Sequence, residues 1–142
     1  MAAIKFFVEE IDFSLTAKRN LHTWLLEVAL SEKHQISALS YIFCSDEYLL
    51  DINKQYLNHN YYTDVITFDN SDDDNEEIEG DIFISIDRVK DNALENKSTF
   101  ARELHRVMVH GLLHLLGYRD KSEEEILEMR EKEEAYLSLQ KF

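Results

Sequence analysis

Two histidines and an aspartate within one short segment are the residues best suited to chemistry. The segment is His-Gly-Leu-Leu-His-Leu-Leu-Gly-Tyr-Arg-Asp, and it contains His110, His114 and Asp120. On an α-helix the two histidines lie one turn apart on the same face, so their rings can bind one metal ion at about 2.0–2.1 Å. Gly117 follows the last apolar turn, where a glycine can end a helix in a left-handed conformation. The chain can then turn back, which makes Asp120 the candidate third ligand.

The helix that carries these histidines is expected to be buried, because its other residues are almost all apolar. Buried imidazoles need polar partners, and either hydrogen bonds at a core edge or a metal ion would provide them. The glycines also have two explanations, since Gly111 suits close helix packing and Gly117 an ordinary helix end. The combination on one apolar helix, in a chain with only three glycines, favours a metal site. Three protein ligands leave a position for water, as in catalytic zinc sites.

The spacing His-x3-His-x2-Gly-x2-Asp resembles the zinc motif of the metzincin proteases, with two differences. Gly111 stands where those proteases have a general-base glutamate, and Asp120 stands where they have a third histidine. Without the glutamate, peptide hydrolysis lacks its proton acceptor. The motif therefore predicts a metal site but no peptidase.

Strand and helix patterns alternate around this segment. Apolar and β-branched runs predict four strands, at residues 4–13, 36–44, 63–68 and 81–86. Apolar residues at helical spacing predict five helices, at residues 16–33, 46–56, 87–96, 99–116 and from a capping box at 122–125 onward. Gly80 and Asp81 are expected to form a tight turn into the last strand. We expect an α+β fold, in which a small mixed four-stranded sheet is covered by about five helices and the metal site lies on a buried helix. A single domain should span residues 1–142.

The composition excludes several classes of protein. With 142 residues, 44% of them hydrophobic and 11% aromatic, the chain is not disordered. No apolar run has the length of a membrane helix, and the N-terminus lacks the apolar stretch of a signal peptide, so a cytoplasmic location is expected. A single cysteine, Cys44, excludes an internal disulfide and a cysteine-based zinc cage.

The formal net charge of −14 disfavours unspecific nucleic-acid binding. About half of the acidic residues lie in two windows, residues 69–79 and 123–134, which are expected to be a mobile loop and a solvated helix face. The remaining chain is close to neutral, so a local anion site is not excluded.

The metal-site segment closely resembles the signature of the YbeY endoribonucleases, bacterial rRNA-maturation factors whose motif is His-Gly-x-Leu-His-Leu-x-Gly-Tyr-Asp-His. The family's Leu-Asn-x2-Tyr, Thr-Asp-Val-Leu-Ser-Phe and Gly-Asp-Ile-x-Ile-Ser are matched by residues 52–56, 63–68 and 80–85. The resemblance runs from about residue 45 onward. It implies a Zn²⁺ held by His110, His114 and Asp120, which would also be the catalytic residues. It further implies single-strand-specific RNA cleavage in 16S rRNA 3′-end maturation and ribosome quality control. The implied partners are single-stranded rRNA and the small ribosomal subunit, with no DNA and no membrane.

Two positions depart from the family pattern. Asp120 replaces a histidine, which lowers the charge of the site by one, weakens the metal as a Lewis acid and shifts its preference toward harder cations. Leu57 stands where the family usually has an arginine, so the cationic partner for a phosphate is missing. His59 or Arg119 would have to replace it, although each is equally explained as a solvated surface residue.

The mechanism expected from these residues is metal-assisted phosphodiester hydrolysis. Thr63 and Asp64 either orient the metal ligands or only begin a strand. Two alternatives remain open: a metal-dependent hydrolase with a non-RNA substrate, which the acidic surface would suit, and a ribosome-associated assembly factor with a mainly structural metal, which Leu57 favours.

Overall fold

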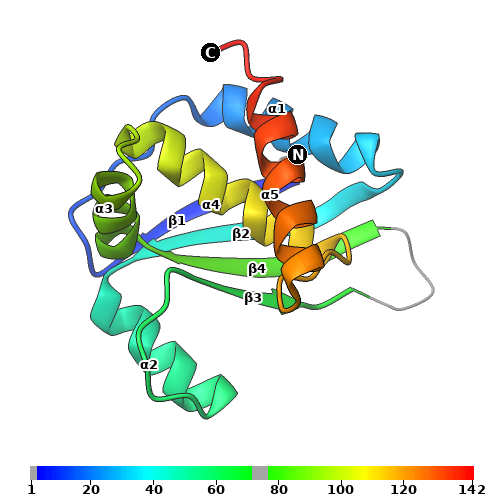
Figure 1. Ribbon diagram of the computed structural model, residues 1–142. Helices are drawn as coiled ribbons and strands as arrows, with labels where there is room; N and C mark the ends of the chain where they lie inside the picture. Colours follow the sequence, from blue (N-terminus) through cyan, green and yellow to red (C-terminus); the bar gives the residue numbers. More distant parts are fainter. Residues whose placement is uncertain (1–2, 72–76) are drawn as a thin grey trace.

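The computed structural model describes residues 3–71 and 77–142, and strands and helices follow one another along this part of the chain (Figure 1). Its strands are β1 (Ile4–Glu9), β2 (Gln35–Cys44), β3 (Val65–Asp69) and β4 (Glu77–Ser85). Its helices are α1 (Lys18–Ser31), α2 (Asp46–Leu57), α3 (Ile86–Glu95), α4 (Phe100–Leu115) and α5 (Glu123–Leu137). The α+β class predicted from the sequence is confirmed, with every expected element present.

The four strands form one mixed sheet in the order β1-β2-β4-β3. The pairs β1–β2 and β2–β4 are parallel, whereas β3 pairs antiparallel with β4 at the sheet edge. β3 and β4 follow one another in the chain, and their antiparallel pairing places β3 directly beside β4. The predicted mixed four-stranded sheet is therefore confirmed.

Helices cover both faces of the sheet because successive side chains of a strand point to opposite sides. Ile82 and Ile84 of β4 join the main core under α1, α4 and α5, whereas Phe83 faces a smaller cluster with Leu49 of α2. Figure 1 shows α2 on the side of the sheet away from α4 and α5. No helix in residues 3–71 and 77–142 combines the length and apolar character required to cross a membrane.

Helix α4 packs on β3 and β4 and is buried over most of its length, as predicted. A Cβ on Gly111 would lie 2.8 Å from Cγ2 of Ile82, so this glycine lets the α4 backbone approach β4 closely. The hydroxyl of Tyr41 donates a 2.8 Å hydrogen bond to the carbonyl oxygen of Met108. These contacts fix the position and rotation of the helix that carries both histidines.

The predicted turn at Gly80 and Asp81 was wrong, because both residues lie inside β4. A Cβ on Gly80 would lie 2.6 Å from the carbonyl oxygen of Phe68 and 3.0 Å from Leu115. The glycine is thus explained by the close approach of β3 and the end of α4 rather than by a turn. β4 begins at Glu77, so the expected loop at 69–79 is shorter than predicted. Residues 72–76, and with them the expected mobility, lie outside the described residues.

Candidate metal centre

The end of α4 forms the turn that the sequence predicted. Gly117 has a φ of +105°, a conformation that favours glycine. The Tyr118 N–H donates to the carbonyl of Leu113, and the Gly117 N–H donates to that of His114, each at 3.0 Å. This pair of bonds is the Schellman pattern that closes a helix and reverses the chain. The reversal carries Asp120 back over the last turns of α4.

Asp120 meets both histidines, as predicted. The Nε2 atoms of His110 and His114 are 3.0 Å apart, and each lies 3.3 Å from Oδ2 of Asp120. A tetrahedral zinc site with bonds of about 2.0–2.1 Å separates its ligand atoms by about 3.3 Å. Within the described residues, this is the group of three histidine, cysteine or acidic side chains whose ligand atoms converge within 4.8 Å. The spacing of the three atoms therefore fits one small divalent ion.

The Nδ1 atoms of both rings have acceptor partners that set their protonation. Nδ1 of His110 lies 2.7 Å from Oε2 of Glu133, and Nδ1 of His114 lies 3.0 Å from the carbonyl oxygen of Tyr118. Because both partners accept, each Nδ1 must carry the hydrogen, and a neutral ring then presents the lone pair of Nε2. Two lone pairs and a carboxylate oxygen thus face one point without a donor between them. A cation at that point satisfies all three, so the residues fit a metal.

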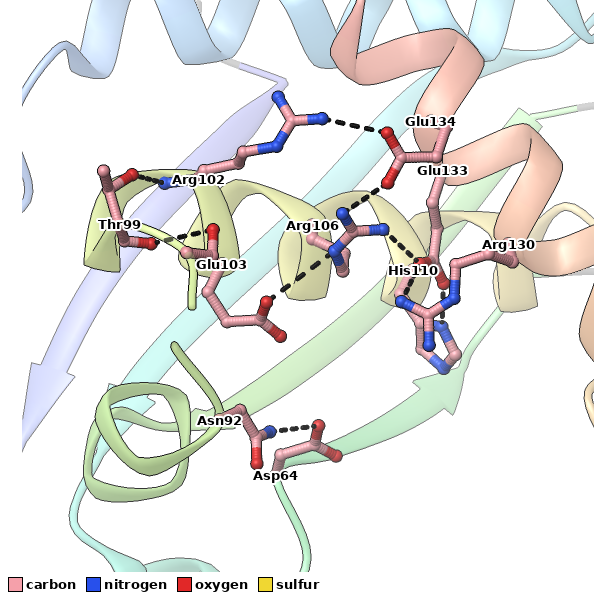
Figure 2. Close-up of polar contacts among 11 residues, drawn as sticks. Asp64, Asn92, Thr99, Arg102, Glu103, Arg106, His110, Arg130, Glu133 and Glu134 are labelled. Atoms are coloured by element: carbon pink, nitrogen blue, oxygen red, sulfur yellow. Dashed lines mark hydrogen bonds and ion pairs between the residues drawn. The ribbon is translucent and has the colours of Figure 1, made fainter. Parts of the chain in front are cut away.

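Glu133 is a site residue that the sequence analysis missed. It is buried, at 4% exposure, and accepts from Nη1 of Arg106 at 3.2 Å as well as from His110. Arg106 also contacts Glu103 and Glu134, so a chain of charges links the metal ligand to α5 (Figure 2). A signal existed in the sequence: Glu133 lies four residues after Met129 and four before Leu137, on the buried stripe of an otherwise acidic helix.

The charges around His110 change its affinity for protons. Burial opposes a charge on the ring, but the hydrogen bond and charge of Glu133, with the charges of Asp120 and Asp64, raise the pKa of His110 above its ordinary value. Protons and metal compete for the same nitrogen. Metal binding at this centre should therefore strengthen as the pH rises.

The three ligands form one wall of a cleft of about 310 Å³. The end of α2, the following loop and β3 form the opposite wall, with Asn53, Leu57, His59, Tyr61, Thr63 and Asp64 among its residues. Asn53 is buried and anchors the loop, because its Nδ2 donates to the carbonyl oxygen of Tyr61 at 2.9 Å. The sequence analysis gave Asn53 no role in the site.

The two candidate replacements for the arginine at Leu57 have different positions. His59 lines the cleft and stacks on Tyr61, whereas Arg119 is exposed and is absent from the cleft wall. Among the described residues that line the cleft there is no lysine or arginine. Leu57 itself lines the cleft, so an apolar side chain stands where the family usually has an arginine.

Thr63 and Asp64 both line the cleft and immediately precede β3. The carboxylate of Asp64 accepts from Nδ2 of Asn92 at 3.3 Å, and its carbonyl accepts from the Ser85 N–H at 2.9 Å. Asp64 therefore helps to begin the strand and also contributes its charge to the site, where it raises the pKa of His110.

Comparison with known proteins places this geometry in a family. The family described as Endoribonuclease YbeY matches residues 4–141. Endoribonuclease YbeY of Cytophaga hutchinsonii is 58% identical over 98% of this chain and 96% of its own length, and that of Flavobacterium psychrophilum is 51% identical over 94% of each. The solution structure of TM1509 from Thermotoga maritima, at 30% identity, superposes with a TM-score of 0.66 over 95% of this chain and 87% of the other. The chain belongs to the Endoribonuclease YbeY family.

Proposed function

We propose that this protein is a metal-dependent endoribonuclease that cleaves single-stranded RNA. We further propose that it acts in the cytoplasm on the 3′ end of 16S rRNA and in ribosome quality control, with the small ribosomal subunit as its partner. Family membership supports RNA cleavage. The observation that carries the metal dependence is the convergence of Nε2 of His110, Nε2 of His114 and Oδ2 of Asp120 at one wall of a cleft.

The protein's own residues would bind the metal ion and orient its ligands. Zn²⁺ is the ion that this set of donor atoms suits best. When bound, the ion would supply Lewis acidity toward a phosphoryl oxygen and lower the pKa of water at the centre. His110, His114 and Asp120 would hold it, while Glu133 and the Tyr118 carbonyl keep both rings in the ligating tautomer. The carboxylate of Asp120 leaves the ion with less positive charge than a third imidazole would, which favours harder cations such as Mn²⁺ more than an all-histidine site does.

The shape of the site supports a single-stranded substrate. The side chains of His110, His114 and Asp120 are 21%, 25% and 38% exposed, so a phosphodiester must enter the cleft to reach them. A flexible single strand can bend one phosphate into such a recess, whereas a stacked duplex holds its phosphates on a stiff outer surface. His59 and Tyr61 offer ring faces at the same cleft, on which an unstacked base can lie.

A second candidate function is a ribosome assembly factor whose metal is mainly structural. The observation that favours it is Leu57, because the cleft lacks the guanidinium that would neutralise a scissile phosphate. The open cleft argues for the nuclease, since structural zinc sites are usually closed by four protein ligands.

The substitution His114→Ala separates the two functions. We expect the purified variant to lose its bound metal by elemental analysis and to cleave a single-stranded oligoribonucleotide at least 100-fold more slowly. It should stay folded by circular dichroism, because a catalytic metal does not hold the fold together, whereas loss of a structural metal would destabilise the protein. His34→Ala, which changes a histidine remote from the cleft, should keep both metal and activity.

Two results would contradict the proposal. Unfolding of the variant together with a parent that does not cleave RNA would favour the assembly factor. Full RNA cleavage by a metal-free His114→Ala protein would show that the reaction does not need the metal.

A further inference from the structure

A second recess lies beside the metal centre, on the side of His110 that faces Glu133. Its volume is about 270 Å³, and α3, α4, α5 and the residue before β3 form its walls. Asp64 and His110 line both this recess and the metal cleft, so the two spaces are neighbours. Figure 2 shows Asp64 and Asn92 on one side of this space and Glu103, Arg106 and His110 on the other. The recess is large enough for one planar ring system next to the ligated imidazole.

The wall of the recess contains a buried carboxylate that is only partly paired. Glu103 is 4% exposed, and its Oε1 accepts no hydrogen bond from the described residues. The nearest cationic atom is Nε of Arg106, at 3.7 Å, which is too far for a hydrogen bond. Buried carboxylates are costly unless donors satisfy them. Glu103 therefore indicates a ligand that brings donors into the recess.

The charges of the wall restrict what that ligand is. Arg106 is already paired with Glu133 and Glu134 as well as with Glu103. The wall carries three carboxylates and only two guanidiniums, so an anionic ligand is disfavoured. These groups belong to Asp64, Glu103, Glu133, Arg106 and Arg130. A divalent cation is disfavoured too, because in the described residues the carboxylates of this recess do not converge as the ligands of the metal centre do. An uncharged molecule rich in hydrogen-bond donors remains.

We propose that this recess binds a guanine base of the RNA substrate, next to the phosphate at the metal centre. This inference rests on the proposed nuclease function and names the base that the site prefers. Guanine offers a ring N–H and an amino group side by side, which match the two oxygens of a carboxylate such as Glu103. Its acceptors on the adjacent edge, O6 and N7, match amide donors. Nδ2 of Asn92 uses one hydrogen for Asp64 and keeps a second, and Asn96 also lines the wall.

Nucleoside binding tests the recess without any cleavage. Guanosine, inosine, adenosine and cytidine are titrated separately into the ¹⁵N-labelled protein, with the side-chain amides of Asn92 and Asn96 as reporters. Guanosine should shift these resonances and bind at least about tenfold more tightly than inosine, which lacks the amino group, since one such hydrogen bond contributes about 1.5 kcal/mol. Equal binding of all four nucleosides, or no shift at the two amides, would overturn the proposal.

The substitution Glu103→Gln assigns the preference to one carboxylate. It should abolish the difference in affinity between guanosine and inosine. Glu95→Gln, the same charge change at an exposed residue of α3, should preserve that difference. The comparison of nucleosides on the unaltered protein decides the question even if the Glu103 variant does not fold.

Cleavage of oligouridine that contains one guanosine separates this inference from the proposed function. We expect cuts at a fixed distance from the guanosine. Cleavage at all positions with equal rates would overturn the guanine pocket and keep the nuclease. Guanosine binding without any RNA cleavage would keep the pocket and overturn the nuclease.

Discussion

A buried carboxylate on α5 determines what His110 can bind. Glu133 accepts from Nδ1 at 2.7 Å, which leaves Nε2 free of hydrogen and directed toward Asp120. Arg106 in turn holds Glu133 through Nη1 at 3.2 Å. A histidine ring without such a partner would sample the other tautomer and other rotations. The arrangement of the proposed ligands thus depends on residues that would not touch the ion.

Replacing Glu133 by Gln should weaken Zn²⁺ binding about 10–100-fold. The amide oxygen can still accept from Nδ1, so the ring stays in place, but the charge that makes the imidazole a better ligand is lost. Competition with a chromophoric chelator measures the dissociation constant directly. Glu131→Gln, an exposed neighbour on α5, serves as the control, and unchanged affinity of the Glu133 variant would refute the role assigned to that carboxylate.

At the scale of elements, the position of α4 on the sheet decides where the site lies. The helix backbone comes close to the sheet at Gly111, where an added Cβ would stand 2.8 Å from Cγ2 of Ile82. Ile82 is fully buried in the central part of β4, so it has little space to withdraw. The glycine between the first histidine and the rest of the motif is therefore required by packing.

Gly111→Ala should lower the free energy of unfolding by up to about 2 kcal/mol. Overpacking a filled core costs about 1–3 kcal/mol, and the better helix propensity of alanine returns only about 1 kcal/mol. Urea unfolding measures the difference. In a background of Ile82→Ala, which removes the contacted atom, the same substitution should cost less. An equal cost in both backgrounds would show that the Ile82 contact is not the cause.

At the scale of the whole molecule, Glu32 joins segments far apart in the chain. It follows α1, and it accepts from the hydroxyls of Tyr118 and Tyr136 and from Nζ of Lys132. Tyr118 also supplies the carbonyl that orients His114. The first helix is thereby connected to the last helix and to the turn behind the metal centre.

The stability that Glu32 contributes should disappear in acid. Burial alone would raise the pKa of Glu32, but the hydrogen bonds from Tyr136, Tyr118 and Lys132 outweigh it and hold the pKa below its ordinary value. The unfolded chain then takes up this proton first as the pH falls, so the contribution is present above about pH 4.5 and is lost below it. At pH 7 the Glu32→Gln protein should be less stable by about 1–2 kcal/mol. The difference in stability should narrow as the pH falls from 4.5 toward 3 in urea titrations of the metal-free proteins, and a constant difference would contradict the assignment.

Local patterns in the sequence were sufficient to predict much of the molecule. Helical periodicity and the Ser122 capping box predicted the helices, because both depend on residues close in the chain. The motif predicted that His110, His114 and Asp120 come together, since the spacing of the two histidines and the conformation of Gly117 are also local. The single-domain organisation of residues 1–142 and the catalytic role of the three ligands stay predictions.

The role of Gly80 and the identity of the Nδ1 partner of His110 depended on the tertiary structure. A glycine in a turn and a glycine under a crowded strand have the same local sequence signal, and only the approach of Phe68 and Leu115 distinguishes them. Glu133 lies 23 residues from His110, and its position along one acidic helix does not reveal which ring it meets. Contacts between distant segments are fixed by how α4 and α5 pack on each other, and the pattern within either helix does not contain that information.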